Sequence, residues 1–294
     1  MESKRESVFS GYHPAVSFTF FAAVIVFSML FMHPLFLAAG LASAFLYSIV
    51  LSGAKAAKYD FALALPALLL LGLINPLFSH RGATVLLYLG DTPVTLESIA
   101  YGAAAAAMLI TVIVWFSCYS TVVTSDKFIY LFSRVIPTTA LIVTMALGLI
   151  PRLKRQAGVI AASQKTLGLE NGTAAQRVRF GLRTVSVLIG WTLESAIDTA
   201  DSMKARGYGL RGRSAFSLYR FDSRDARALA VLLTLIALCL AGLCSGGAGF
   251  AYYPQLQAPR LTVPLIASLA AYLLLALFPT VIEIQGEWSW RLSR

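Results

Sequence analysis

Charged residues are scarce in this chain. Asp, Glu, Lys and Arg make up 13% of its 294 residues, whereas hydrophobic residues make up 58%. Soluble domains carry about 25% charged residues, which cover the surface that faces water. A soluble protein of the present composition would leave large apolar patches exposed. The composition therefore excludes an ordinary soluble domain and indicates an exterior that faces lipid.

Metal ligands and catalytic side chains are also sparse. The three histidines and three cysteines are scattered in or near the ends of apolar runs (His13, His33, His80, Cys118, Cys239 and Cys244). No cysteine pair has metal-ligand spacing with a histidine nearby. The chain lacks the G-x-x-x-x-G-K-[ST] loop of P-loop ATPases. A membrane enzyme acting on lipids would need clustered acid, base or metal-binding groups. We therefore expect no cofactor, no metal and no enzyme activity here.

Six apolar runs are long enough to cross a bilayer, which takes about 17–25 helical residues. They cover residues 16–32, 34–52, 61–79, 96–120, 226–246 and 261–283. Inside lipid the backbone must satisfy its own hydrogen bonds, which favours helices. Thr95 and Glu97 are typical of the first turn of the fourth run, and residues 80–95 before it are expected to form an external loop. The sequence predicts an all-α integral membrane protein with about six spans.

Basic residues lie almost entirely on one side of these runs. With a cytoplasmic N-terminus, 22 of the 24 lysines and arginines fall inside and only Arg81 and Arg260 fall outside. The positive-inside rule gives this asymmetry. We therefore predict a multi-pass protein of the cell membrane with both termini in the cytoplasm.

The segment 121–225 differs from the rest and divides the chain into membrane helices 1–120, a cytoplasmic coupling region 121–225 and membrane helices 226–294. It holds 15 basic and 7 acidic residues but keeps the apolar periodicity of helices. Three helices are predicted there. The first runs from Asp126 to Ile150 and is broken or bent at Pro137. The second starts at Pro151 and ends at Gly168, and the third runs from about Thr173 to Arg206 and closes at Gly207.

The third predicted helix has two different faces. At 100° per residue, one face carries Leu193, Ala196, Ile197, Ala200 and Met203, and the opposite face carries Glu194, Asp198 and Asp201. The acidic stripe could pair with arginine or lysine of the preceding helix, or it could face water. The sequence leaves both interpretations open.

The second and third predicted helices end in similar sequences. Residues 163–168 and 202–207 each place a serine, then a lysine two residues on, then a glycine three residues later. Two such ends could enter two equivalent grooves of a dimeric partner, with Arg206 gripping a carboxylate through its two-point fork. Alternatively, Arg206 simply neutralises its own helix C-terminus.

Two stretches carry a resemblance to a known family. IPRLKRQAGVIAASQKTLGLE and SAIDTADSMKARGYG resemble the transmembrane (T) component of energy-coupling factor (ECF) importers, which take up vitamins and metal ions. That family starts one coupling helix with Ile-Pro-Arg, which places Arg152 in this motif. It ends two coupling helices with Ala-Arg-Gly. The second triplet is intact here as Ala205, Arg206 and Gly207. At the position of the first triplet the chain has Thr166, Leu167 and Gly168, so leucine replaces the arginine.

The resemblance implies a non-catalytic scaffold. It would join two ABC-type ATPase subunits to a membrane-embedded substrate-binding (S) component, with the triplet ends docking on the ATPases. The coupling helices would support the S component, and the charged residues along them would assist (Arg152, Lys165, Glu194, Asp198, Asp201 and Lys204). Our own hypothesis is that Leu167 enters an apolar groove on one of two non-identical ATPases, although the sequence leaves open whether the two ATPases are identical or different.

Two alternatives concern other partners. A permease that forms its own substrate pathway would need polar residues along its spans, and few are present. The basic segment lacks a nucleic-acid-binding motif, and anionic lipid headgroups account for much of its charge. We expect the lipid bilayer, and no nucleic acid, as a further partner. The sequence does not name the substrate.

Overall fold

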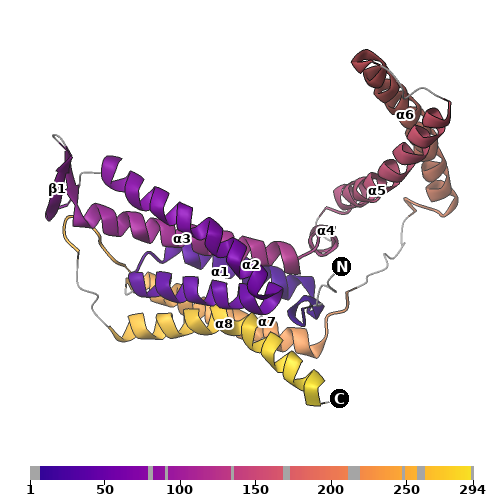
Figure 1. The fold of residues 1–294 in the computed structure, drawn as a ribbon. Coiled ribbons are helices and arrows are strands. Elements are labelled where there is room, and N and C mark those ends of the chain that lie inside the picture. Colours follow the sequence, from indigo (N-terminus) through magenta and orange to yellow (C-terminus); the bar gives the residue numbers. More distant parts are fainter. Residues whose placement is uncertain are drawn as a thin grey trace. The chain divides into compact units, whose positions relative to one another are not determined.

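A computed structural model describes residues 7–78, 82–89, 92–133, 136–167, 173–210, 219–246, 249–256 and 262–292. The chain is largely helical, with one short hairpin (Figure 1). The elements are η1 (Phe9–Gly11), α1 (Pro14–Leu30), α2 (Pro34–Phe78), β1 (Val85–Leu89), β2 (Thr92–Thr95), α3 (Leu96–Val122), α4 (Ser125–Ser133), α5 (Pro137–Thr166), α6 (Ala174–Ala205), α7 (Ser223–Cys244) and α8 (Val263–Leu292).

The elements form two compact units. The membrane unit comprises Met1–Lys127 and Tyr219–Arg294, and the inserted unit comprises Phe128–Leu218. In the membrane unit, α2 packs on α3 and α8, α1 packs on α3, and α7 packs on α8. The inserted unit consists of most of α4 followed by α5 and α6, which pack on each other.

Among the described residues, four helical segments are long and apolar enough to cross a bilayer. They are Pro34–Gly53, Leu96–Val122, Ser223–Cys244 and Val263–Gly286, and the apolar α1 has 17 residues. The predicted second and third runs are joined in α2, which changes direction at Gly53 (φ 77°). The prediction of an all-α membrane protein is confirmed, and the count of six spans stays a prediction.

One detail of the predicted helices is corrected. Pro137 does separate α4 from α5, but Pro151 does not start a helix, because α5 continues through it. A proline removes one backbone hydrogen bond. Residues of α5 around Pro151, from Thr144 to Arg152, border a pocket between α5 and α6, and α5 stays continuous there despite the loss of this bond. The loop expected at 80–95 contains the antiparallel hairpin β1–β2.

An aromatic cluster forms the centre of the membrane unit. Phe20, Phe21 and Trp115 are fully buried and meet edge to face, with ring centroids 5.1–6.2 Å apart. Tyr47 of α2 stacks on Trp115 at 5.8 Å. Such arrangements match the quadrupoles of the rings. They join α1, α2 and α3 at one level of the bundle.

Small residues let other helices of the membrane unit approach closely, as is common in bilayers. A Cβ atom on Gly242 of α7 would overlap Ser268 of α8. Gly242→Ala is therefore expected to lower the free energy of unfolding by about 1–3 kcal/mol, the usual cost of overpacking. Thermal unfolding in detergent measures this. The control is Gly190→Ala in α6, where nothing lies within 4 Å. An unchanged melting temperature for Gly242→Ala would contradict the close packing.

The N-terminal segment, residues 7–13, is tied to the membrane unit by charged side chains. The Glu283 carboxylate of α8 accepts hydrogen bonds from the backbone N–H groups of Val8 and Phe9, at 2.9 and 3.1 Å. Lys127 donates from Nζ to the carbonyls of Ser10 (2.6 Å) and Val122 (3.0 Å). Burial lowers the pKa of Lys127 below its ordinary value. This segment therefore links α8 to the C-terminal end of α3.

Helix α7 holds the same segment from another side. Arg224 donates from Nη2 to the Gly11 carbonyl at 3.1 Å and stacks over the Tyr12 ring at 4.1 Å. Asp225 accepts from the His13 backbone N–H at 3.2 Å. Lys127 is the last residue of the membrane unit before the inserted unit. The N-terminal segment thus contacts α7 as well as α8 and Lys127.

Glu283→Gln is expected to weaken this arrangement, because an amide turns one of its two acceptors into a donor. A buried backbone N–H that loses its partner costs about 1–3 kcal/mol. The melting temperature in detergent should fall, and trypsin should cleave after Lys127 faster. Glu194→Gln in α6, which removes an exposed carboxylate, is the matched control. Equal stability of the two variants would show that the carboxylate does not hold residues 7–13.

Candidate docking site at the ends of two helices

The C-terminus of α6 ends in a Schellman motif. The N–H of Gly207 bonds to the Lys204 carbonyl at 2.9 Å, and the N–H of Tyr208 bonds to the Met203 carbonyl at 3.0 Å. Gly207 has φ 73°, the left-handed conformation that glycine adopts at this position. The predicted end at Gly207 is confirmed. The motif places Arg206 at the C-cap position of α6.

The C-cap residue of α5 has nearly the same backbone angles as the C-cap residue of α6. Leu167 has φ −83° and ψ 6°, and Arg206 has φ −80° and ψ 6°. The N–H of Leu167 points to the Lys165 carbonyl, whereas the N–H of Arg206 bonds to the Ser202 carbonyl at 3.1 Å and also points to the Lys204 carbonyl. Thr166 additionally donates to the Ser163 carbonyl at 2.7 Å. The similarity of the two sequences thus extends to the backbone, with Leu167 at the place of Arg206.

The side chains at both ends are available for contact. Thr166, Ala205 and Arg206 are exposed, and Leu167 is 74% exposed, which is high for an apolar residue at a helix end. The predicted contact residue Gly168 lies outside the described residues. One end therefore presents a guanidinium group and the other an apolar side chain on similar backbones.

The charged residues predicted to support docking lie on the surfaces of α5 and α6. Lys165, Glu194 and Asp198 are exposed. Asp201 forms an exposed ion pair with Lys204 of the same helix at 3.8 Å. The residues of α6 that line its contact with α5 fall on the opposite side of the helix from this acidic stripe, at 100° per residue. Whether the acidic residues of α6 pair with α5 or face water therefore stays open, as in the sequence.

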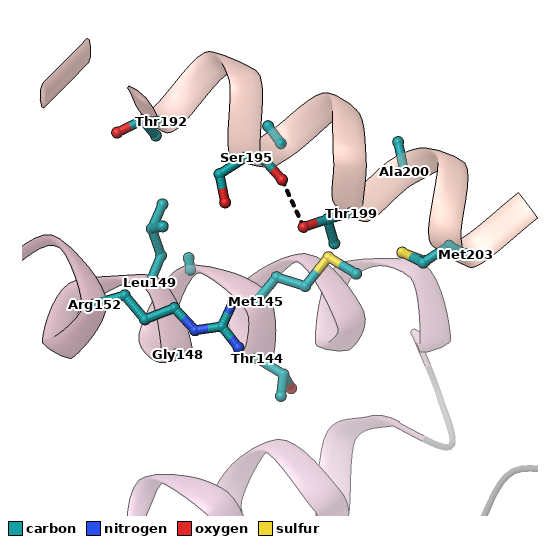
Figure 2. Close-up of a pocket in the computed structure, with 12 residues that line it drawn as sticks. Thr144, Met145, Gly148, Leu149, Arg152, Thr192, Ser195, Thr199, Ala200 and Met203 are labelled. Atoms are coloured by element: carbon teal, nitrogen blue, oxygen red, sulfur yellow. Dashed lines mark hydrogen bonds between the residues drawn. The ribbon is translucent and has the colours of Figure 1, made fainter. Parts of the chain in front are cut away.

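A pocket of about 440 Å³ lies between α5 and α6 (Figure 2). Small and hydroxyl-bearing residues line most of it, and Arg152 of α5 also belongs to its wall. Met145 of α5 and Met203 of α6 lie at the same end of the pocket in Figure 2. Thr199 bonds to the Ser195 carbonyl of its own helix at 2.7 Å. The two helices are therefore held together by few large side chains.

The sequence analysis missed most of an apolar surface on α6. Six large residues at spacings of three or four are each 51–65% exposed, and we call them the α6 stripe (Val178, Leu182, Val185, Ile189, Leu193 and Ile197). Of the apolar face predicted earlier, Ala196, Ala200 and Met203 line the pocket instead. The helical periodicity of the residues before Leu193 was the available signal. An exposed apolar surface of this size usually marks a contact with another protein or with lipid.

A metal ion would need a cluster of suitable side chains. Among the described residues, no three His, Cys, Asp or Glu residues come together. Exposed cations, an exposed leucine and an apolar stripe instead suit contact with other proteins.

Comparison with known proteins identifies the family of the chain. The model of the family "CbiQ: Cobalt transport protein" matches residues 10–217, which include the first membrane helices and nearly all of the inserted unit. The chain belongs to this family. A relative from Listeria innocua serovar 6a, named energy-coupling factor transporter transmembrane protein EcfT, is 29% identical over 185 residues. The match spans 58% of this chain and 69% of the relative.

These comparisons confirm the resemblance found in the sequence. The chain is a T component of the energy-coupling factor transporters and therefore a membrane transport protein. The CbiQ family is a family of transporter permeases rather than of catalytic subunits.

Proposed function

We propose that this T component is the non-catalytic scaffold of an ATP-driven importer. The ends of α5 and α6 dock two ABC-type ATPase subunits, and movement of these helices reorients a substrate-binding S component. The observation that carries the proposal is the shared backbone of Leu167 and Arg206. Two similar ends on one chain suit a partner with two similar grooves, as a dimer of ATPases would provide.

The charge and exposure of these residues support both the docking of the ATPases and the contact with the S component. Arg206 can bind a carboxylate of one ATPase bidentately, with Lys204 and Asp201 beside it. Leu167 fits an apolar groove, which favours two non-identical ATPases. The α6 stripe offers an apolar face to the S component, which is itself a membrane protein. Both termini and the inserted unit lie in the cytoplasm, as the basic residues indicate.

The proposal is tested by purification of the tagged chain from its native membranes in mild detergent. We expect P-loop ATPases and a small hydrophobic protein to co-purify, and the identity of the latter would indicate the vitamin or metal ion carried. The complex, reconstituted in vesicles, should take up that substrate only with ATP. Recovery of the chain alone, or of a homo-oligomer that transports a solute by itself, would instead support a permease with its own pathway.

A further inference from the structure

The β1–β2 hairpin exposes apolar side chains on both faces. Val85, Leu86, Leu87 and Tyr88 are 42%, 56%, 59% and 66% exposed. Successive residues of a strand point to opposite faces, so neither face of β1 is buried against the protein. A two-stranded hairpin is at best marginally stable in water. Four adjacent exposed apolar residues on such a hairpin indicate a surface that something covers.

The apolar surface of the hairpin continues the lipid-facing surface of the spanning helices. Phe78, the last residue of α2, is 85% exposed, and Leu96 and Ile99 in the first turn of α3 are 42% and 39% exposed. Figure 1 shows the hairpin beyond the ends of α2 and α3, with its strands running across the direction of these helices. The hairpin therefore lies where the bilayer surface is expected, roughly along its plane.

Polar contacts fix the base of the hairpin at this level. The buried Glu97 carboxylate accepts from the Thr84 hydroxyl and from the Thr84 backbone N–H. The Ala83 N–H bonds to the Pro254 carbonyl at 3.0 Å. Beside Pro254, the rings of Tyr101 and Tyr253 lie 5.6 Å apart. Tyrosines favour the headgroup level of a bilayer, which sets the expected depth.

The backbone sets a limit to that depth. A two-stranded sheet leaves the outer N–H and C=O groups of both strands without a strand partner. In the hydrocarbon core such groups cost several kcal/mol each, whereas water remains available among the headgroups. The side chains thus favour lipid, and the backbone excludes the hydrocarbon centre.

We propose that the β1–β2 hairpin is a membrane-interface element, which lies among the lipid headgroups with the apolar side chains of one face of β1 inserted toward the acyl chains. It lies at the end of α3 opposite to the N-terminal segment, because that segment contacts Val122 through Lys127. The proposal does not depend on ATPase docking, and it assigns lipid rather than a protein partner to this surface.

Quenching of a fluorescent label tests the depth. In a chain with Cys118, Cys239 and Cys244 replaced, Leu86→Cys, Leu87→Cys and Tyr88→Cys are each labelled with bimane and reconstituted in nanodiscs of phosphatidylcholine and phosphatidylglycerol. Doxyl-lipid and aqueous iodide serve as the two quenchers. Leu109→Cys in α3, 41% exposed, is the lipid control, and Asp201→Cys is the water control.

Because positions 86 and 87 point to opposite faces of β1, we expect lipid quenching close to that at 109 for at least one of them. Iodide quenching at that position should be about threefold weaker than at 201, since interfacial side chains lie ~5–10 Å deep. Iodide quenching equal to that at 201 at both positions would overturn the proposal and place the hairpin in water. Labels protected from both quenchers would also overturn it, because a protein would then be the cover. Position 88 gives an independent reading should one variant fail to fold.

Discussion

Replacing Arg206 with alanine is expected to abolish ATP-driven uptake while the membrane unit still folds. Removing one partner of a desolvated charge pair at an interface costs 2–5 kcal/mol. That cost corresponds to a dissociation constant for the ATPase that is larger by about 30-fold or more. Arg206 is exposed in this chain, so its loss should not disturb the fold. Co-purification of the ATPases and uptake into vesicles measure the two effects.

Two further variants separate docking from a local role of Arg206. Lys204→Ala removes a cation from the same turn, whose exposed pair with Asp201 contributes at most about 1 kcal/mol, and it should keep uptake. Arg206→Lys keeps the charge but loses the two-point fork, and it should restore uptake only in part. If Arg206 only neutralised its own helix end, lysine would replace it fully and alanine would cost under about 1 kcal/mol. Full uptake by the Arg206→Ala variant would contradict the role of Arg206 in ATPase docking.

The sequence predicted those features that depend on neighbouring residues. Thr95 caps α3, since its side chain accepts from the Ser98 N–H, and Gly207 closes α6, because each needs only a short pattern around it. The backbone similarity of Leu167 and Arg206 follows from the same local pattern. The membrane class follows from composition alone.

Features that depend on distant residues could not be predicted. Glu283 bonds to Val8 and Phe9 across more than 270 residues, and no local pattern indicates such a contact. The continuity of α5 through Pro151 goes against the usual effect of proline, and no local pattern indicates it. The hairpin was missed because β1 is uniformly apolar and does not show the alternation of a half-buried strand.

Replacing Leu167 with arginine is expected to weaken docking of one ATPase, although it restores the triplet pattern of the family. An apolar groove that buries a leucine gains about 1.5–3 kcal/mol, and a charge placed there without a partner would be costly. We expect at least about tenfold weaker binding of that ATPase. Binding of the other ATPase at Arg206 should be unchanged. Pull-down with the two ATPases tagged separately measures both.

Leu167→Met provides the control, because it conserves volume and apolar character and usually costs under about 1.5 kcal/mol. A groove that selects shape and apolarity accepts methionine and rejects arginine. A groove built for arginine, in which leucine is merely tolerated, binds more tightly to Leu167→Arg than to the native chain. The second result would make the two docking ends equivalent and remove the reason to expect two kinds of ATPase. The first would mean that the difference between Leu167 and Arg206, on one backbone geometry, determines which ATPase binds at each helix.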